Sequence, residues 1–396
     1  MRLILTLPFL AAPALASFRD FGIPASSATV DVKAFNVASF TLNNLTHVFV
    51  KPVLPGQETI TLPIFAFLLE HKPTKRRFMF DLGIRNDPEN LPPTFAGLFK
   101  SKTITLGKFK DITQLLVDGG IALKSIKAIF WSHGHFDHIG DMKKWPKKRK
   151  IVVSSQTDTS IFPDNKNSDF QASDFAGHKL IKADFSRSNL TISGMRALDQ
   201  FGDGSFYLLD APGHFGGHVI GLARTTPTSF IILGADTLHH AGALRPGGAF
   251  QANIPCPGEL VESARSAIST DFFWSPRTGP GRFDIASRTE PLLALSDTPD
   301  SFFVDPTAAQ LSVSKLAALD ADKDFLTLVT HDGSITSALP TFPASLADWQ
   351  KQGLKEKLAW LFLDGKNPSF LFQPKGRAKR EAHTHHPNED VSKEDD

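Results

Sequence analysis

The chain has 396 residues, a formal net charge of +2, 41% hydrophobic residues and 21% charged residues. This length suits one large domain or two smaller ones, and the composition is typical of a globular protein rather than a disordered or fibrous one. The net charge is too small to indicate a nucleic-acid partner. The basic run at 143–150 is explained as a solvated helix end and turn.

The first 16 residues have the features of a secretory signal peptide. Arg2 provides a positive start, residues 3–10 form a short apolar run, and residues 14–16 (Ala-Leu-Ala) fit the small-x-small pattern that precedes cleavage. The run is too short for a typical membrane span. We therefore predict cleavage after Ala16, secretion and no stable membrane insertion, with an apolar N-terminal strand as the alternative.

Two other features bear on the secretory route. N-glycosylation sequons begin at Asn44 and Asn189, so a glycoprotein is expected. Cys256 is the only cysteine, which excludes an internal disulfide and leaves the core, and metal if present, to hold the fold. Because Cys256 lies between two prolines without a partner motif, we predict no catalytic role for its thiol.

The predicted elements begin with a β-rich region at 30–85. Its clearest strands are expected at 48–50, 61–69 and 77–81. A short amphipathic helix is predicted at 110–119, further strands at 128–131, 150–153, 206–209, 230–233 and 326–329, and a helix at 354–362. We expect one hydrolase domain over 17–374 with a Pro-, Gly- and Ser-rich insertion at about 242–310, and a charged, disordered tail at 375–396.

Four of these strands are followed by histidine or aspartate. The polar positions are the cluster at 133–138, then His214, Asp236 and His331. Strands that present polar side chains from their ends, with helices between them, favour a layered α/β sandwich.

The cluster that carries the chemistry is His133-Gly-His135-Phe-Asp137-His138. His133 and His135 project the same way from an extended loop, so both can bind one metal, while Asp137 and His138 can face a second. Imidazole and carboxylate ligands suit zinc and also accept iron, manganese or cobalt. Three histidines and an aspartate within six residues rarely occur together as core residues. The cluster therefore predicts a two-metal site.

This motif resembles the HxHxDH signature of the metallo-β-lactamase superfamily, and the resemblance extends over about residues 40–365. It implies a four-layer αβ/βα sandwich with the metal site at one edge of the two sheets. His214, Asp236 and His331 match the family's downstream histidine, bridging aspartate and last histidine. Asp81 matches an early structural aspartate.

The resemblance implies seven ligands around two divalent metal ions, with zinc as the first candidate. By this match, His133, His135 and His214 hold one ion, Asp137, His138 and His331 hold the other, and Asp236 bridges them. A shared carboxylate can hold two dications within about 4 Å, and a bridging water then loses a proton near neutral pH. That hydroxide would attack a carbonyl or phosphoryl centre, and Asp137 would orient it and transfer a proton.

Two further histidines lie close to this pattern. His218 shares the Pro-Gly-His-x-x-Gly-His element with His214, and we expect it to support the ligands without binding metal itself. His239 follows Asp236 by three residues, where the lactonases that this chain resembles have a substrate-binding tyrosine. We predict that His239 polarises the substrate carbonyl or protonates the leaving group, with a structural role as the alternative.

The resemblance favours the quorum-quenching lactonase branch, whose fungal relatives open lactone or lactam rings. Class B β-lactamases usually lack the bridging aspartate, and nucleases need a basic channel. We therefore predict a small-molecule substrate, a cyclic ester or amide, hydrolysed by a metal-bridging hydroxide. The alternatives are a thioesterase of the same superfamily and a non-catalytic metal-binding member. The sequence does not indicate the oligomeric state.

Overall fold

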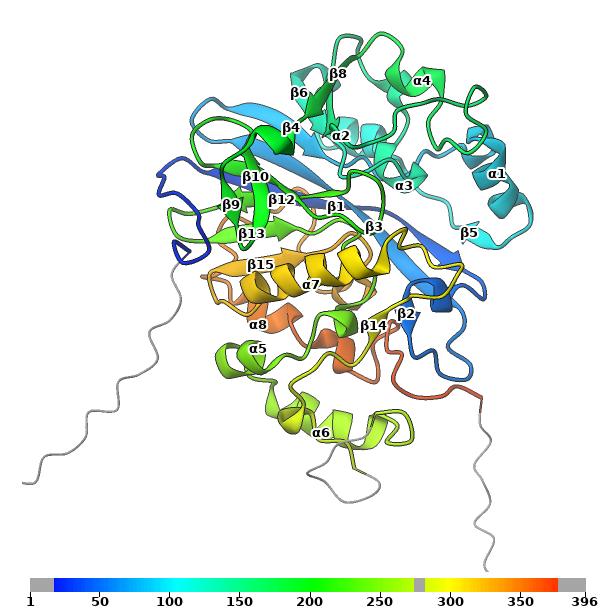
Figure 1. The fold of residues 1–396 in the computed structure, drawn as a ribbon, viewed down its shortest axis with the longest axis vertical. Coiled ribbons are helices and arrows are strands. Elements are labelled where there is room, and N and C mark those ends of the chain that lie inside the picture. Colours follow the sequence, from blue (N-terminus) through cyan, green and yellow to red (C-terminus); the bar gives the residue numbers. More distant parts are fainter. Residues whose placement is uncertain (1–17, 274–281, 377–396) are drawn as a thin grey trace, which may run out of the picture.

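The computed structural model describes residues 18–273 and 282–376, and Figure 1 shows their arrangement. The signal peptide predicted at 1–16 and residues 377–396 of the predicted tail lie outside the described residues. Two β-sheets stack face to face, with helices on their outer sides. This arrangement confirms the predicted α/β sandwich.

The first sheet has seven strands. Their order is β5 (Ile104–Leu106), β1 (Val30–Leu42), β3 (Ile60–His71), β4 (Arg76–Phe80), β6 (Ile126–Phe130), β7 (Lys150–Ser154) and β8 (Lys179–Ala183). The strands from β5 to β4 are antiparallel, and those from β4 to β8 run parallel. The parallel half matters for function because it places successive carboxyl ends at one edge of the sheet.

The second sheet has six strands. Their order is β15 (Phe325–Leu328), β13 (Phe230–Leu233), β12 (Val219–Arg224), β11 (Phe206–Asp210), β10 (Met195–Asp199) and β9 (Thr191–Ile192). Only the pair of β13 and β15 is parallel. A separate two-stranded ladder joins β2 (Val50–Lys51) to β14 (Ala294–Leu295).

Alternating side chains divide the core into layers. Phe78 and Phe80 of β4 point into the space between the sheets, whereas Met79 packs under the outer helices. This period of two is what a pleated strand with both faces buried requires. The helices are α1 (Pro93–Lys100), α2 (Ile112–Asp118), α3 (Phe136–Ile139), α4 (Ala172–Phe175), α5 (Gly248–Asn253), α6 (Gly258–Ala267), α7 (Pro306–Asp320) and α8 (Leu354–Leu358).

Two predicted elements are wrong in detail. The strand expected at 48–50 is a 3-10 turn at Thr46–Val48 followed by β2. The helix expected at 354–362 ends at Leu358, and a 3-10 helix follows at Leu361–Leu363. Tertiary packing explains the second break, because the buried Trp360 donates its indole N–H to the Ile254 carbonyl at 3.0 Å.

The region predicted as an insertion, 242–310, contains α5, α6, β14 and the start of α7. A buried ion pair fastens it to the rest of the chain: both Arg245 Nε and Nη2 donate to the Asp320 carboxylate at 2.8 Å. Figure 1 shows α7 lying along β15 on the outer side of the second sheet. Within 18–273 and 282–376 the structure contains no helix with the length and apolar character of a membrane span.

Candidate metal centre

The loop after β6 is held in shape by Asp81, which follows the neighbouring parallel strand β4. Asp81 Oδ1 accepts from the Ser132 amide at 2.7 Å, and Oδ2 accepts from the Ser132 hydroxyl and from His138 Nδ1, each at 2.8 Å. His133 Nδ1 in turn lies 2.9 Å from the Ser132 hydroxyl oxygen. These bonds occupy Nδ1 of each histidine and leave its Nε2 beside the other predicted donors, His135 for His133 and Asp236 for His138. Asp81 therefore holds this loop in shape, which is the structural role that the resemblance implies.

The remaining polar residues arrive from three other strand ends. His214 follows β11, Asp236 follows β13 and His331 follows β15. Because β13 and β15 are parallel, their carboxyl ends bring His331 Nε2 to 3.3 Å from Asp236 Oδ2. His331 is oriented by the Pro63 carbonyl, which accepts from its Nδ1 at 2.8 Å.

The structure brings all seven predicted ligands together, in groups whose donor atoms lie within 4.8 Å of one another. One group is His133, His135, His214 and Asp236; a second is Asp137, His138 and His331; a third is Asp236, His239 and His331. The first two groups match the division that the resemblance implies. Asp236 touches both, since its Oδ1 lies 3.0 Å from His138 Nε2 and its Oδ2 lies 3.3 Å from His214 Nε2.

The spacing of these donors fits a tetrahedral ion. Zinc–nitrogen bonds of about 2.0–2.1 Å place neighbouring donors roughly 3.3 Å apart. In the first group His135 Nδ1 lies 2.8 Å from His133 Nε2 and 3.1 Å from His214 Nε2. In the second group His331 Nε2 lies 3.3 Å from Asp137 Oδ2.

Burial and charge also favour cations at this centre. Burial lowers the pKa of His133 and His135 well below the usual range, and that of His214 to about 4, so these imidazoles are in the neutral form that binds metal. Burial alone would also lower the pKa of His331, but the Asp236 and Asp137 carboxylates outweigh it and raise that pKa to about 9. The centre therefore attracts positive charge.

His218 and His240 lie beside the donor groups without joining them. His218 Nδ1 donates to the Ala211 carbonyl at 2.9 Å, and its Nε2 accepts from the Asp236 amide at 3.2 Å. These two bonds occupy both ring nitrogens, which fits a supporting role. His240 is similarly occupied by the Ser369 carbonyl and the Gly242 amide.

His239, in contrast, belongs to the centre. Its Nε2 lies 3.2 Å from Asp236 Oδ2, and its ring is nearly parallel to that of His331, at 9° with centroids 5.2 Å apart. The Phe49 ring packs on its other side with centroids 4.3 Å apart. His239 is therefore one of the residues that surround Asp236.

Sequence reasoning missed the aromatic mouth of the centre. Phe49 and Phe302, with ring centroids 5.2 Å apart, line a cavity of about 20 Å³ beside the donors. This volume holds about one water molecule. No local pattern could have singled out these residues, because the chain has 34 phenylalanines. Asp169 was also missed: burial, with the nearby Asp137 carboxylate, raises its pKa to about 7.

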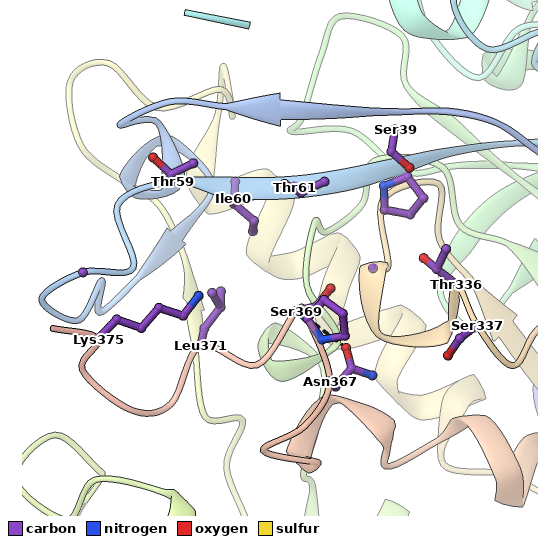
Figure 2. Close-up of a pocket in the computed structure, with 14 residues that line it drawn as sticks. Ser39, Thr59, Ile60, Thr61, Thr336, Ser337, Asn367, Ser369, Leu371 and Lys375 are labelled. Atoms are coloured by element: carbon purple, nitrogen blue, oxygen red, sulfur yellow. Dashed lines mark hydrogen bonds between the residues drawn. The ribbon is translucent and has the colours of Figure 1, made fainter. Parts of the chain in front are cut away.

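The cavity in Figure 2 is larger, about 570 Å³, but none of the metal-centre donors lines it. Figure 2 shows Thr59, Ile60 and Thr61 of the β3 region on one side and Asn367 and Ser369 of the C-terminal segment on the other. It is therefore a separate feature of the surface.

Comparison with known proteins agrees with this geometry. Residues 60–227 match the metallo-beta-lactamase superfamily model. The chain is 35% identical over 363 residues to Gamma-lactamase FDB1 of Fusarium pseudograminearum, covering 86% of this chain and 83% of that protein. It is 32% identical over 369 residues to Metallo-hydrolase mfmC of Annulohypoxylon moriforme, covering 88% and 90%.

A solved structure described as "Indirect contributions of mutations underlie optimization of new enzyme function" has the same fold. It aligns with a TM-score of 0.50 at 16% identity, over 80% of this chain and 98% of the other. The fold, the matched region and the relatives that align over most of their length agree with the HxHxDH motif. The chain belongs to the metallo-β-lactamase superfamily.

Proposed function

We propose that this protein is a metal-dependent hydrolase that opens the ring of a small lactone or lactam. The observation that carries the proposal is the position of Asp236, whose carboxylate lies beside histidines of both donor groups. Oδ1 lies 3.0 Å from His138, and Oδ2 lies 3.3 Å from both His214 and His331. Similarity to a γ-lactamase over most of its length supports the ring-opening class.

The donors favour two divalent ions, with zinc first, because they are nitrogens and carboxylate oxygens without sulfur. His133, His135 and His214 would hold one ion; Asp137, His138 and His331 would hold the other; Asp236 would bridge them. Bound there, the ions would polarise the ring carbonyl and activate water.

Asp137 would move the proton in this reaction. Burial would raise its pKa, but His138 and His331 outweigh burial and lower that pKa, so the carboxylate is ionised and can accept a proton from water. The carbonyl carbon gains the water oxygen, the ring C–O or C–N bond breaks, and Asp137 returns the proton to the leaving atom. His239 Nε2 would donate a hydrogen bond to the carbonyl oxygen or to the leaving atom.

The mouth of the centre indicates a neutral ring. Apart from the donor residues and His239, the residues that line the small cavity are apolar: Phe40, Leu42, Phe49, Ile104, Phe136 and Phe302. Within the part of the chain that the structure describes, no lysine or arginine lines it. An uncharged lactone or lactam would enter such a mouth with less desolvation cost than an anionic thioester.

The test is a substrate panel of lactones, lactams and acyl thioesters, assayed with the zinc-loaded protein and with two variants. Asp236→Ala should lower the rate of ring opening at least about 100-fold and should bind less metal. Asp210→Ala, at the end of β11 but outside the donor groups, should retain both properties. Turnover of thioesters without turnover of either ring class would contradict the proposal.

We also propose that the chain is secreted and glycosylated, with its hydrolase domain starting at residue 17. The asparagines of both sequons, Asn44 and Asn189, are exposed, which an acceptor requires. N-terminal sequencing of secreted material should begin at Ser17, and enzymatic deglycosylation should lower its mass. A retained Met1 would show that the signal peptide was misassigned.

A further inference from the structure

A third cavity, with a volume of about 620 Å³, opens beside Arg76 of β4, Lys127 of β6 and Lys150 of β7. The cavity extends along β6 from Lys127 to Phe130, and none of the predicted metal ligands, which follow the carboxyl end of that strand, is among the residues that line it. The aromatic rings of Phe78, Phe130 and Phe201 line it. It therefore belongs to neither the metal centre nor its mouth.

Strand alternation explains why this cavity is apolar inside and basic at its rim. Arg76 and Phe78 are two residues apart on β4, and Lys150 and Val152 are two apart on β7, so these two cations each share a sheet face with an apolar residue. That face points toward the second sheet, where Phe78, Phe130 and Val152 join the core between the sheets. Lys127 of β6 is not explained by this alternation; it lies where the pairing of β4 with β6 shifts register. The Phe201 ring closes the floor, 4.6 Å from the Phe78 ring between centroids.

Three cations surround this cavity. Arg76, Lys127 and Lys150 are exposed, and none makes an ion pair or side-chain hydrogen bond within residues 18–273 and 282–376. Among the described residues, no carboxylate lines the cavity. Like charges gathered beside an apolar floor repel one another, and an anion that spans them removes this repulsion.

The acids on adjoining segments already have partners. Asp203 accepts from His71 Nε2 at 2.7 Å and from the Ser205 hydroxyl at 2.6 Å. Glu70 accepts from Arg77 at 3.1 Å. These carboxylates are therefore not free to neutralise the three cations.

We propose that this cavity binds a small amphipathic acid, whose anionic head lies among Arg76, Lys127 and Lys150 and whose alkyl or aryl body packs on Phe78, Phe130 and Phe201. Its volume is within the range of about 300–1,000 Å³ that is usual for small-molecule sites. An anionic head accounts for the cations, and an apolar body accounts for the aromatic floor.

Calorimetric titration of the full-length, metal-loaded protein with decanoate, below its micelle concentration, tests the proposal. Decanoate should bind once per chain. Decanol should bind about tenfold more weakly, since it lacks the charge, and decyltrimethylammonium should not bind. Equal affinity for decanol and decanoate would overturn the anionic part of the proposal.

The triple variant Arg76→Gln, Lys127→Gln, Lys150→Gln should raise the decanoate Kd about tenfold. The matched control Lys100→Gln, Lys108→Gln, Lys366→Gln makes the same charge change at exposed positions outside the cavity and should leave Kd unchanged. The single variant Lys150→Glu provides a second measure and should also weaken decanoate binding. An unchanged circular dichroism spectrum would show that this variant is folded. An unchanged Kd in these cavity variants would overturn the proposal.

Two further measurements distinguish binding in this cavity from binding at the metal centre and from binding to a membrane. Decanoate should still bind the metal-free protein, and loss of binding there would show that its carboxylate binds the metal centre instead. Binding to vesicles that contain phosphatidylserine, without binding to dissolved decanoate, would show a membrane-facing surface and overturn the small-molecule site. Neither measurement depends on hydrolytic activity, so the outcome is independent of the proposed ring-opening function.

Discussion

His138 lies between two aspartates that have different roles. Its Nδ1 donates to Asp81 Oδ2 at 2.8 Å, while its Nε2 faces Asp236 Oδ1 at 3.0 Å. A hydrogen bond from one ring nitrogen to a carboxylate fixes the tautomer and makes the other nitrogen a better ligand. Asp81 therefore positions a metal ligand without belonging to any donor group.

Asp81→Asn should weaken binding of the second metal ion about 10- to 100-fold. The carboxylate of Asp81 carries a negative charge that offsets the proton on His138 Nδ1, whereas the amide of asparagine is neutral. Competition with a chelator of known affinity would measure the change. Asp141→Asn is a matched control, since Asp141 caps the turn at Met142–Lys144 and is outside the donor groups. If Asp81→Asn and the unmodified protein bind metal with equal affinity, then Asp81 does not support metal binding through His138.

His239→Ala should lower kcat for ring opening by about 10²- to 10⁴-fold, the usual contribution of a positioned proton donor, while both ions stay bound. His239→Tyr should recover part of this loss, because a phenol can also donate a hydrogen bond. The metal content of each variant, measured by mass spectrometry, distinguishes between two roles for His239, namely proton donor and metal ligand. A parallel loss of metal and activity would show that His239 is a ligand.

Phe302→Ala should admit larger rings to the centre. The cavity beside the donors holds about 20 Å³, and segment 296–302 closes it through hydrogen bonds from the Ser296 amide to the Phe49 carbonyl and from the Phe302 amide to the Val48 carbonyl. We expect kcat/KM to rise about tenfold for bulky substrates relative to small ones.

The exposed Phe272 offers a control for this change, as Phe272→Ala should leave the ratio unaltered. The rate at which dipicolinate removes metal gives a second measure of access that needs no substrate. If neither the ratio nor this rate changes in Phe302→Ala, then Phe302 does not limit entry.

The metal-free protein should lose stability as the pH rises from about 6.5 to 9. The carboxylates of Asp236 and Asp137 raise the folded-state pKa of His331 to about 9, above the value near 6.5 in an unfolded chain. A raised histidine pKa adds stability that is complete below the unfolded value and disappears as pH passes the folded value.

Urea unfolding of the metal-free protein at several pH values would measure this loss, and His331→Gln should reduce its slope. The zinc-loaded protein should behave differently, since metal binding needs neutral imidazole and is lost as the pH falls. A metal-free protein whose stability rises between pH 6.5 and 9 would contradict the assignment.

The sequence by itself determined the fold class and the residues that gather at the metal centre. The cluster from His133 to His138 is contained in one short loop, so its spacing alone brings the side chains together. His214, Asp236 and His331 were recognisable because each follows an apolar strand, and the parallel pairing of β13 and β15 brings such strand ends to one edge.

Only the tertiary structure decided what surrounds that centre. Phe49 and Phe302 meet through the pairing of short segments that are about 250 residues apart, and no local pattern marks them among so many phenylalanines. Arg76, Lys127 and Lys150 surround a common cavity because parallel strands align their amino ends. Contacts of this kind depend on strand order and register, which are properties of the whole sheet rather than of any single segment.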